Sequence, residues 1–265
     1  MTAPPSNPRP ALRDIFRTLF VHSTLLLALL LFMLLFAPFL LLAGLTFDRD
    51  RRLTRRAVRA LFPRLLRGFA ALSGTPLQLD PLPAIPGPCI IVANHASCID
   101  VLLLMALPAP LGNGRVWAKD WPFHVPLLGA LMRLSGHLFV NDFNLLPDAQ
   151  DCLADGSSLL VFPESSRSRT GRLSRFHDGA FLLAARTNRP ILPVAIHGSF
   201  ACMPPGQPWV FRPHLRVQPL PLLYPDPADP KARIAVRREA HALIQKALHP
   251  SAQAAPEPVP EPAAA

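Results

Sequence analysis

The chain is poor in the residues that build zinc sites and redox centres. Its 265 residues include four cysteines, and no two of them have the spacing of a zinc or redox motif. We expect these cysteines to be buried free thiols in a reducing compartment. The sequence therefore predicts neither a metal site nor a cofactor.

Lysine is also scarce, with three lysines against 24 arginines, a bias typical of GC-rich bacterial genomes. The net charge is nevertheless +10, which raises the question of nucleic-acid binding. However, no module that combines aromatic and basic residues accompanies the arginines. We therefore expect no nucleic-acid partner.

Charge of either sign is absent from Leu19 to Phe47. This apolar run exceeds the roughly 7–15 residues of a signal-peptide core and reaches the ~20 residues that span a bilayer. It predicts either a transmembrane helix or a helical hairpin that enters one leaflet and bends near Pro38. Arginines lie on both sides of the run, which favours the hairpin or a helix in the membrane plane.

Eight arginines follow the run between Arg49 and Arg67. Basic residues beside an apolar segment bind anionic headgroups and mark the cytoplasmic side of a membrane. We therefore expect the chain at the cell inner membrane, with membrane lipids as partners and its globular part on the cytoplasmic side.

The chain divides into four parts. Residues 1–10 and 249–265 are predicted to be disordered, residues 11–72 to hold the membrane-associated helices, and residues 73–248 to form a globular domain. In that domain, short apolar strands alternate with helices after a linker with five prolines at 73–88. Alternation predicts an α/β fold, a layered mixed or mostly parallel sheet flanked by helices. The clearest strands are expected at 89–93, 115–118, 158–162 and 191–196, with helices at 127–134, 179–187 and 232–248.

No Gly-x-Ser-x-Gly elbow occurs, so the serine nucleophile of a lipase or thioesterase is not predicted. Instead, His95 falls where a strand ends and a helix is about to begin, and Asp100 follows five residues later. A turn brings the carboxylate to one ring nitrogen, fixes the tautomer and leaves the other nitrogen as a general base. The alternative is that Asp100 only caps the helix. Ser97 and Cys98, between the two, are candidate covalent nucleophiles.

A second polar group follows the apolar strand that ends near residue 162. Arg167 can form a forked, charge-assisted pair with a phosphate. Glu164 can accept a hydrogen bond from a substrate hydroxyl, or it can orient Arg167. The alternative is a surface ion pair between the two, which contributes little to stability.

In this order and at this separation, the two groups resemble the motifs of the glycerolipid acyltransferase family, which includes the 1-acylglycerol-3-phosphate O-acyltransferases. The family's Asn-His-x-x-x-x-Asp block is matched at Asn94, His95 and Asp100. Its Phe-Pro-Glu-Gly-Thr-Arg-Ser block is matched at Phe162, Pro163, Glu164, Arg167 and Ser168, whereas Ser165 and Ser166 replace Gly and Thr. The likeness covers roughly residues 75–220.

Two departures concern the phosphate of the acceptor. The family's second block usually ends in an arginine that is thought to hold this phosphate, and residues 136–142 contain no arginine. The family often has a lysine shortly after the third block, where this chain has His177. Arg167 is then the best remaining phosphate ligand, with His177, Lys119 or one of the arginines 169, 172 and 175 to supply further charge.

The resemblance implies a membrane-bound O-acyltransferase. The donor is acyl-CoA or acyl carrier protein, and the acceptor is a lysophospholipid, foremost 1-acylglycerol-3-phosphate, which becomes phosphatidic acid. His95 is the general base and Asp100 stabilises its imidazolium. The expected substrate-binding residues are Asn94, Lys119, Glu164, Arg167, Ser168 and His177, with Asn94 or a backbone N–H as donor to the oxyanion.

Two alternatives stay open at this point. The first is transfer to another lysolipid, such as a lyso-ornithine lipid, which the missing second-block arginine favours. The second is a non-catalytic, membrane-anchored lipid-binding protein. The intact His95, Asp100 and Glu164 argue against that second alternative, because a binding protein needs no base.

Overall fold

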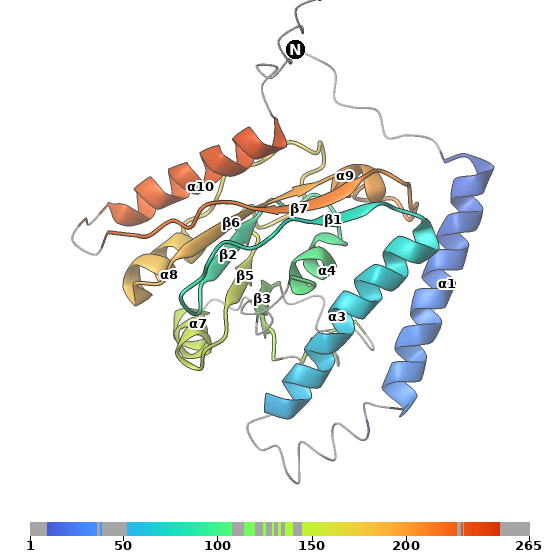
Figure 1. The fold of residues 1–265 in the computed structure, drawn as a ribbon, viewed down its shortest axis with the longest axis horizontal. Coiled ribbons are helices and arrows are strands. Elements are labelled where there is room, and N and C mark those ends of the chain that lie inside the picture. The colour runs from blue at the N-terminus through green and yellow to red at the C-terminus, as the bar shows by residue number, and fades with distance from the viewer. Residues whose placement is uncertain are drawn as a thin grey trace, which may run out of the picture.

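The computed structural model describes residues 10–35, 38, 52–107, 114–119, 124–125, 129, 132–133, 136–139, 145–226, 229 and 231–249. Within these ranges an α/β domain lies beside two long N-terminal helices (Figure 1). The helices are α1 (Leu12–Leu35), α3 (Arg52–Ser73), α4 (Asp100–Met105), α7 (Leu145–Ala154), α8 (Gly179–Thr187), α9 (Ser199–Cys202) and α10 (Ala232–Leu248). The strands are β1 (Leu77–Leu79), β2 (Ile90–Ala93), β3 (Arg115–Ala118), β4 (Leu138–Phe139), β5 (Leu159–Val161), β6 (Ile191–His197) and β7 (Leu215–Pro219).

The strands form one sheet in the order β1-β7-β6-β2-β5-β3-β4. Neighbouring strands are parallel, except for β6 and β7, which are antiparallel. This arrangement confirms the predicted α/β fold with a mixed, mostly parallel sheet. Every residue of the central strands β2 and β5 is buried. Parallel strands with both faces covered are continuously apolar, which is why these segments show no alternation in the sequence.

Helices cover both faces of the sheet, and each face has its own hydrophobic core. One core contains Phe62, Leu66 and Phe69 of α3 together with Leu103 of α4 and residues of β2 and β6. The other core packs side chains of α7, α8 and α10, such as Phe181, against the opposite face. With helices on both faces, the carboxyl ends of the parallel strands are left as the edge where polar groups can gather.

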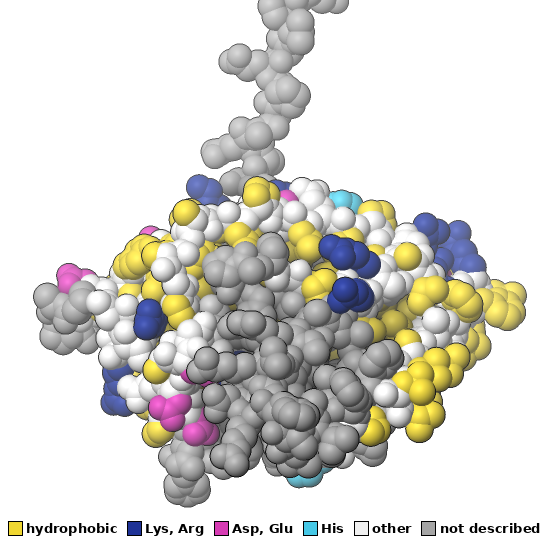
Figure 2. All heavy atoms as spheres, turned by 60° about the horizontal axis from the view of Figure 1, so that its bottom comes forward, with side chains coloured by type: hydrophobic (Ala, Val, Ile, Leu, Met, Phe, Trp, Pro, Cys, Tyr) yellow, Lys and Arg dark blue, Asp and Glu magenta, His cyan; other side chains and the backbone are white. Residues whose placement is uncertain are grey.

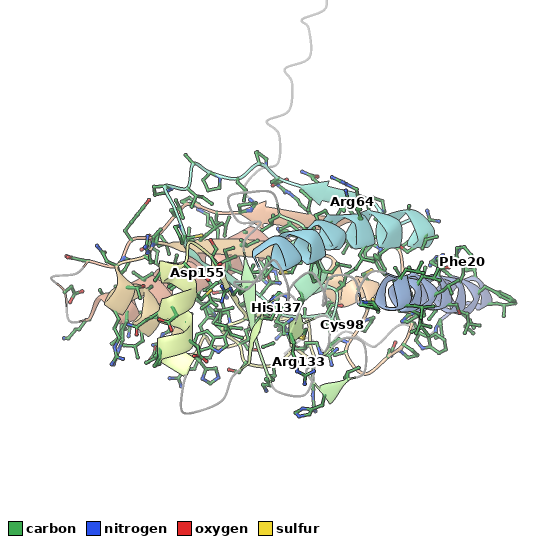
Figure 3. All side chains as sticks on the ribbon, turned by 90° about the horizontal axis from the view of Figure 1, so that it is seen from below. Phe20, Arg64, Cys98, Arg133, His137 and Asp155 are labelled. Atoms are coloured by element: carbon green, nitrogen blue, oxygen red, sulfur yellow. The ribbon has the colours of Figure 1, made fainter. Side chains whose placement is uncertain are left out.

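The two N-terminal helices pack against each other (Figure 3), where Phe20 marks α1 and Arg64 marks α3. Val21 of α1 is fully buried and joins the core beneath α3. The rest of α1 exposes many large apolar side chains, including Leu19, Phe20 and Leu27, each more than half exposed. Helix α1 therefore has a buried side, toward α3, and a long apolar side that no described residue covers.

Among the residues that the structure describes, no helix combines the length and the apolar character needed to cross a membrane. The transmembrane helix expected from the apolar run is therefore not supported. The first part of the run, Leu19–Leu35, continues a helix that begins at Leu12 and includes the charged residues Arg13, Asp14 and Arg17.

Several other predicted features fall wholly or mainly outside the described residues. They are the disordered ends, the bend near Pro38 and most of the helix at 127–134.

Candidate active site

His95 and Asp100 meet at the carboxyl end of β2, as the sequence predicts. His95 follows β2 by two residues, and Asp100 begins α4. His95 Nδ1 lies 2.9 Å from Asp100 Oδ2, and the Asp100 side chain is fully buried. Because a carboxylate only accepts hydrogen bonds, Nδ1 carries the proton in this pair and Nε2 is left as a base.

The turn between the two residues is held by the same carboxylate oxygen. Asp100 Oδ2 also accepts hydrogen bonds from the backbone N–H groups of Ala96 and Ser97, each at 2.7 Å. Three donors on one oxygen fix the carboxylate in one orientation. Asp100 therefore shapes the turn before α4 and holds the imidazole. No side-chain hydrogen bond caps α4, so the helix-capping alternative is not supported.

Phe162 supports the imidazole from the neighbouring strand end. The rings of His95 and Phe162 are stacked, with centroids 4.1 Å apart and planes inclined by 20°. Since β2 and β5 are parallel neighbours, their carboxyl ends bring these rings together. The His95 side chain keeps 17% of its surface exposed. It is thus held by Asp100 and Phe162 but remains open to the cavity described below.

Glu164 ties the strand end of His95 to the loop that follows β5. Its Oε1 accepts a hydrogen bond from the His95 backbone N–H at 2.7 Å, and its Oε2 accepts one from the Ser174 N–H at 2.8 Å. Burial raises the pKa of Glu164, although these N–H groups oppose that shift. Both oxygens are occupied by backbone groups, so this geometry gives Glu164 a positioning role and does not direct it at a substrate.

Asn94 and Ser168 are likewise engaged with the backbone. The Asn94 amide donates to the Ile196 carbonyl at 2.9 Å and accepts from the Ile196 N–H at 2.8 Å, which links β2 to β6. The Ser168 N–H donates to the His95 carbonyl at 2.7 Å, and its hydroxyl donates to the Arg172 carbonyl at 2.7 Å. These contacts do not support the direct substrate contacts expected for Asn94 and Ser168.

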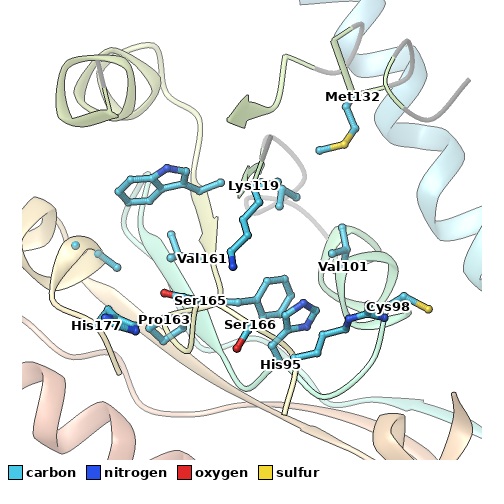
Figure 4. Close-up of a pocket in the computed structure, with 17 residues that line it drawn as sticks. His95, Cys98, Val101, Lys119, Met132, Val161, Pro163, Ser165, Ser166 and His177 are labelled. Carbon is cyan, nitrogen blue, oxygen red and sulfur yellow. The ribbon is translucent and has the colours of Figure 1, made fainter. Parts of the chain in front are cut away.

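A cavity of about 540 Å³ opens beside the His95 ring (Figure 4). Its lining includes three basic side chains, Lys119, Arg167 and His177. Lys119 extends into the cavity toward Ser165 and Ser166. Apolar side chains form much of the rest, including Val101, Val116, Trp117, Met132 and Val161. The cavity therefore combines cationic and apolar side chains next to the His95 ring, a combination that suits an amphipathic anion.

Of the eight predicted site residues, five line the cavity or hold the His95 ring, and the other three bond the backbone around them. His95, Lys119, Arg167 and His177 line the cavity, and Asp100 holds His95 from behind. The compensating arginines 169, 172 and 175 are exposed and do not line it. Sequence reasoning missed Phe162 as a partner of the imidazole, and it missed the apolar walls. The motif match pointed at Phe162, but residues from separate strands such as Val116 carry no local signal.

Ser97 and Cys98 are poorly placed as nucleophiles. The Ser97 hydroxyl donates to the Met203 carbonyl at 2.9 Å. Cys98 borders the cavity, but its side chain points away from the His95 ring (Figure 4). Desolvation raises the pKa of the Cys98 thiol even though the residue is exposed at the protein surface. A protonated thiol is a weak nucleophile.

Comparison with known proteins points to one family. Residues 78–197 match the model of the Acyltransferase family. The chain is 31% identical over 221 residues to a 1-acyl-sn-glycerol-3-phosphate acyltransferase of Chlamydomonas reinhardtii, a match that covers 78% of this chain and 62% of that protein. It is 32% identical over 189 residues to the chloroplastic 1-acyl-sn-glycerol-3-phosphate acyltransferase BAT2 of Brassica napus, which covers 68% of this chain and 52% of the relative. The chain thus spans less than two thirds of the length of these curated relatives.

The fold has a counterpart among solved structures. The crystal structure of the 1-acyl-sn-glycerophosphate acyltransferase from Thermotoga maritima superposes with a TM-score of 0.72 at 20% sequence identity. The superposition covers 89% of this chain and 94% of that chain. At this level of identity the likeness establishes a shared fold.

Proposed function

Residues 78–197 belong to the acyltransferase family, and from this premise we propose that the chain is a 1-acylglycerol-3-phosphate O-acyltransferase. It transfers a fatty acyl group from a thioester donor to the free hydroxyl of a lysophospholipid, with 1-acylglycerol-3-phosphate as the first candidate. The observation that carries this proposal is the His95 ring, held at Nδ1 by Asp100 and bordering the cavity.

The proposed reaction uses His95 as the base. The acceptor hydroxyl gives its proton to Nε2 while its oxygen attacks the carbonyl carbon of the thioester. Asp100 stabilises the imidazolium that forms. The C–S bond then breaks, and the departing thiolate takes the proton back from His95. Because Ser97 is hydrogen-bonded elsewhere and the Cys98 thiol is protonated, direct transfer without an acyl-enzyme fits the site best.

The basic and the apolar side chains of the cavity suit the two ends of the substrates. Lys119, Arg167 and His177 supply up to three positive charges, and a phosphate monoester carries close to two negative charges. These residues take over the role of the absent second-block arginine. The apolar walls around Val116 and Met132 accommodate acyl chain. The thioester donor is acyl-CoA or acyl carrier protein, because both present the same acyl thioester.

Access to lipid substrates requires contact with a membrane, and α1 offers the surface for it. Leu26, Leu27, Leu34 and Leu35 are 54%, 56%, 72% and 62% exposed. An exposed apolar patch of this kind marks an interaction surface. We place this face of α1 in the interfacial region of the cell inner membrane, on the cytoplasmic side, with the helix lying along the membrane.

The experiment that tests this proposal measures acyl transfer directly. Purified protein receives labelled acyl-CoA or acyl carrier protein with lysophosphatidic acid, a lyso-ornithine lipid or no acceptor. We expect phosphatidic acid as the product. His95→Ala should reduce the rate about 10²–10⁴-fold, because it removes the base, while His249→Ala, an exposed histidine at the end of α10, should not change it.

Two results would count against the proposal. A His95→Ala variant with the normal rate would end the base mechanism. Acyl transfer by the wild-type protein to the lyso-ornithine lipid, with none to lysophosphatidic acid, would show that the acceptor is a different lysolipid. The missing second-block arginine supports that alternative.

A further inference from the structure

A second hollow, of about 500 Å³, lies at the N-terminal end of α1. Three arginines line it, Arg13 and Arg17 from α1 and Arg212 from the segment before β7. It shares no lining residue with the cavity at His95. Three guanidinium groups from two separate parts of the chain therefore converge on one surface hollow that the acyl-transfer reaction does not use.

Arg212 is held in the hollow by close packing on Gly74. Its Nε donates to the Gly74 carbonyl at 2.9 Å. Gly74 has a φ of +64°, and a Cβ there would lie 2.7 Å from a terminal nitrogen of Arg212. A side chain at position 74 would thus displace the guanidinium. Among the described residues, no hydrogen bond engages the remaining N–H groups of Arg212, which can therefore bind a ligand.

Of the described residues that line the hollow, Asp14 is the one with a carboxylate, and this carboxylate already has partners. Asp14 is 8% exposed, and its two oxygens accept from Arg17 at 2.8 Å and from the Ala11 N–H at 2.9 Å. Arg17 also donates to the Val210 carbonyl at 3.3 Å. Among the described residues, the ion pairs include Arg17 but neither Arg13 nor Arg212. The hollow therefore carries a surplus of two positive charges.

Apolar side chains adjoin this charge. Leu12, Phe16 and Phe20 recur every four residues along α1 and are 69%, 65% and 57% exposed. Figure 2 shows hydrophobic side chains along the side of the molecule that α1 forms, with Lys and Arg side chains beside them. A ligand that fills both surfaces is an amphiphile whose anionic group faces the arginines. Guanidinium groups bind phosphate through forked hydrogen bonds.

We infer that Arg13, Arg17 and Arg212 form a binding site for the headgroup phosphate of an anionic membrane phospholipid, outside the catalytic cavity. The inference rests on the proposed membrane docking of α1 and adds a specific headgroup contact to it. A lipid bound there serves as an anchor and not as a substrate, because the site lies apart from His95.

The position of the site also orients the catalytic centre. The Val210 N–H donates to Thr18 Oγ1 at 2.9 Å, and the Phe211 N–H donates to the Cys202 carbonyl at 2.8 Å. The adjoining Met203 carbonyl accepts from Ser97, in the turn between His95 and Asp100. A lipid phosphate fixed by Arg212 therefore sets the direction in which the catalytic turn faces the bilayer.

The test compares vesicle binding of two double variants. Arg13→Gln with Arg212→Gln removes two charges from the site. Arg233→Gln with Arg238→Gln is the matched control, since both arginines are exposed on α10, on the opposite face of the sheet. On phosphatidylcholine vesicles that contain phosphatidylglycerol, the site variant should bind about 30-fold more weakly than wild type, and the control should bind as wild type does. On pure phosphatidylcholine vesicles all three should bind equally.

Other outcomes overturn the inference. Equal binding of the site variant and the control to anionic vesicles would exclude a headgroup site. If the site variant lost binding equally to both kinds of vesicle, the cause would be a change in the fold or in the apolar face of α1. Release of wild-type protein by inorganic phosphate, at constant ionic strength, would make the free anion the ligand. If the double variant does not fold, the single variant Arg13→Gln is used, because it changes only an exposed side chain. It should bind vesicles that contain phosphatidylglycerol about fivefold more weakly than wild type.

The acyl-transfer assay separates this inference from the proposed function. Normal acyl transfer together with unchanged vesicle binding of the site variant would overturn only the headgroup site. Selective loss of binding to anionic vesicles by the site variant, in a protein without acyl transfer, would overturn only the catalytic proposal.

Discussion

Single residues in the site divide into those that face the cavity and those that hold the backbone. Glu164 belongs to the second group, since its oxygens accept from the N–H groups of His95 and Ser174. Glu164→Gln keeps one accepting oxygen but places an NH2 group against the other N–H. We expect kcat to fall about tenfold to 100-fold with little change in KM, because the base is displaced while the binding groups stay. Steady-state kinetics measure both. A raised acceptor KM with normal kcat would instead show that Glu164 contacts the substrate.

The raised pKa of Glu164 has its own consequence for stability. In the folded protein this carboxyl keeps its proton at a pH where the unfolded chain has lost it, because burial disfavours the charge. The contribution of Glu164 to the free energy of unfolding therefore falls as pH rises from about 4.3 through the raised pKa and is constant above it. Urea unfolding across this range should show a steeper decline for wild type than for Glu164→Gln. If the free energy of unfolding changed with pH in the same way for both proteins, the predicted fall in the contribution of Glu164 would be contradicted.

Arg167 belongs to the residues that face the cavity. Arg167→Ala should raise the KM for lysophosphatidic acid about tenfold to 100-fold, as expected when a charged hydrogen-bond donor to phosphate is lost, and should leave the donor KM nearly unchanged. Arg169→Ala is the matched control, because Arg169 is exposed two residues away and does not line the cavity. Similar effects of both variants would point to the general charge of the loop as the cause, and not to a phosphate contact.

At the scale of elements, the turn that follows β6 requires a glycine, because it leaves no room for a Cβ atom. Gly198 lies between β6 and α9 with a φ of +79°, and a Cβ would come 2.2 Å from the His214 carbonyl oxygen. Gly156 has a φ of +86° but nothing near its Cβ position. Gly156→Ala should therefore cost about 1–2 kcal/mol of stability from backbone strain alone. Gly198→Ala should cost at least about 1 kcal/mol more, because the turn and β7 must separate. Thermal unfolding measures both losses of stability. Equal losses for the two variants would show that the contact between the new Cβ and the His214 carbonyl relaxes without cost.

At the scale of the whole molecule, the exposed side of α1 is the contact that we propose with a lipid surface. Phe20 and Leu27 are 57% and 56% exposed. Replacing both by Gln removes apolar surface and should preserve α1, because Gln is a good helix former. Each change should weaken binding to phosphatidylcholine vesicles by about 1.5 kcal/mol or more. Tyr224→Ser is the control, because Tyr224 is 60% exposed in the segment that follows β7. Unchanged sedimentation of the double variant with vesicles would place the membrane contact elsewhere.

The sequence by itself determined the contact between His95 and Asp100 and the α/β fold class. His95 and Asp100 are five residues apart, so one turn brings them together and the distance between them depends on local backbone alone. The alternation of short apolar strands with helices predicted a mixed or mostly parallel sheet, because each helix connects strands that run in the same direction. Helices α8 and α10 begin and end where the sequence pattern predicted.

Only the tertiary structure decided what the remaining motif residues do. Whether Glu164 and Asn94 face a substrate or the backbone depends on partners 10 and 102 residues away in the chain, Ser174 and Ile196. Strand β1 was predicted as linker, because its three residues lie among prolines and its pairing partner is β7, far along the chain. The arginine hollow has the same origin. Arg13 and Arg212 are distant in sequence, and they come together because α1, α3 and the segment before β7 pack into one molecule.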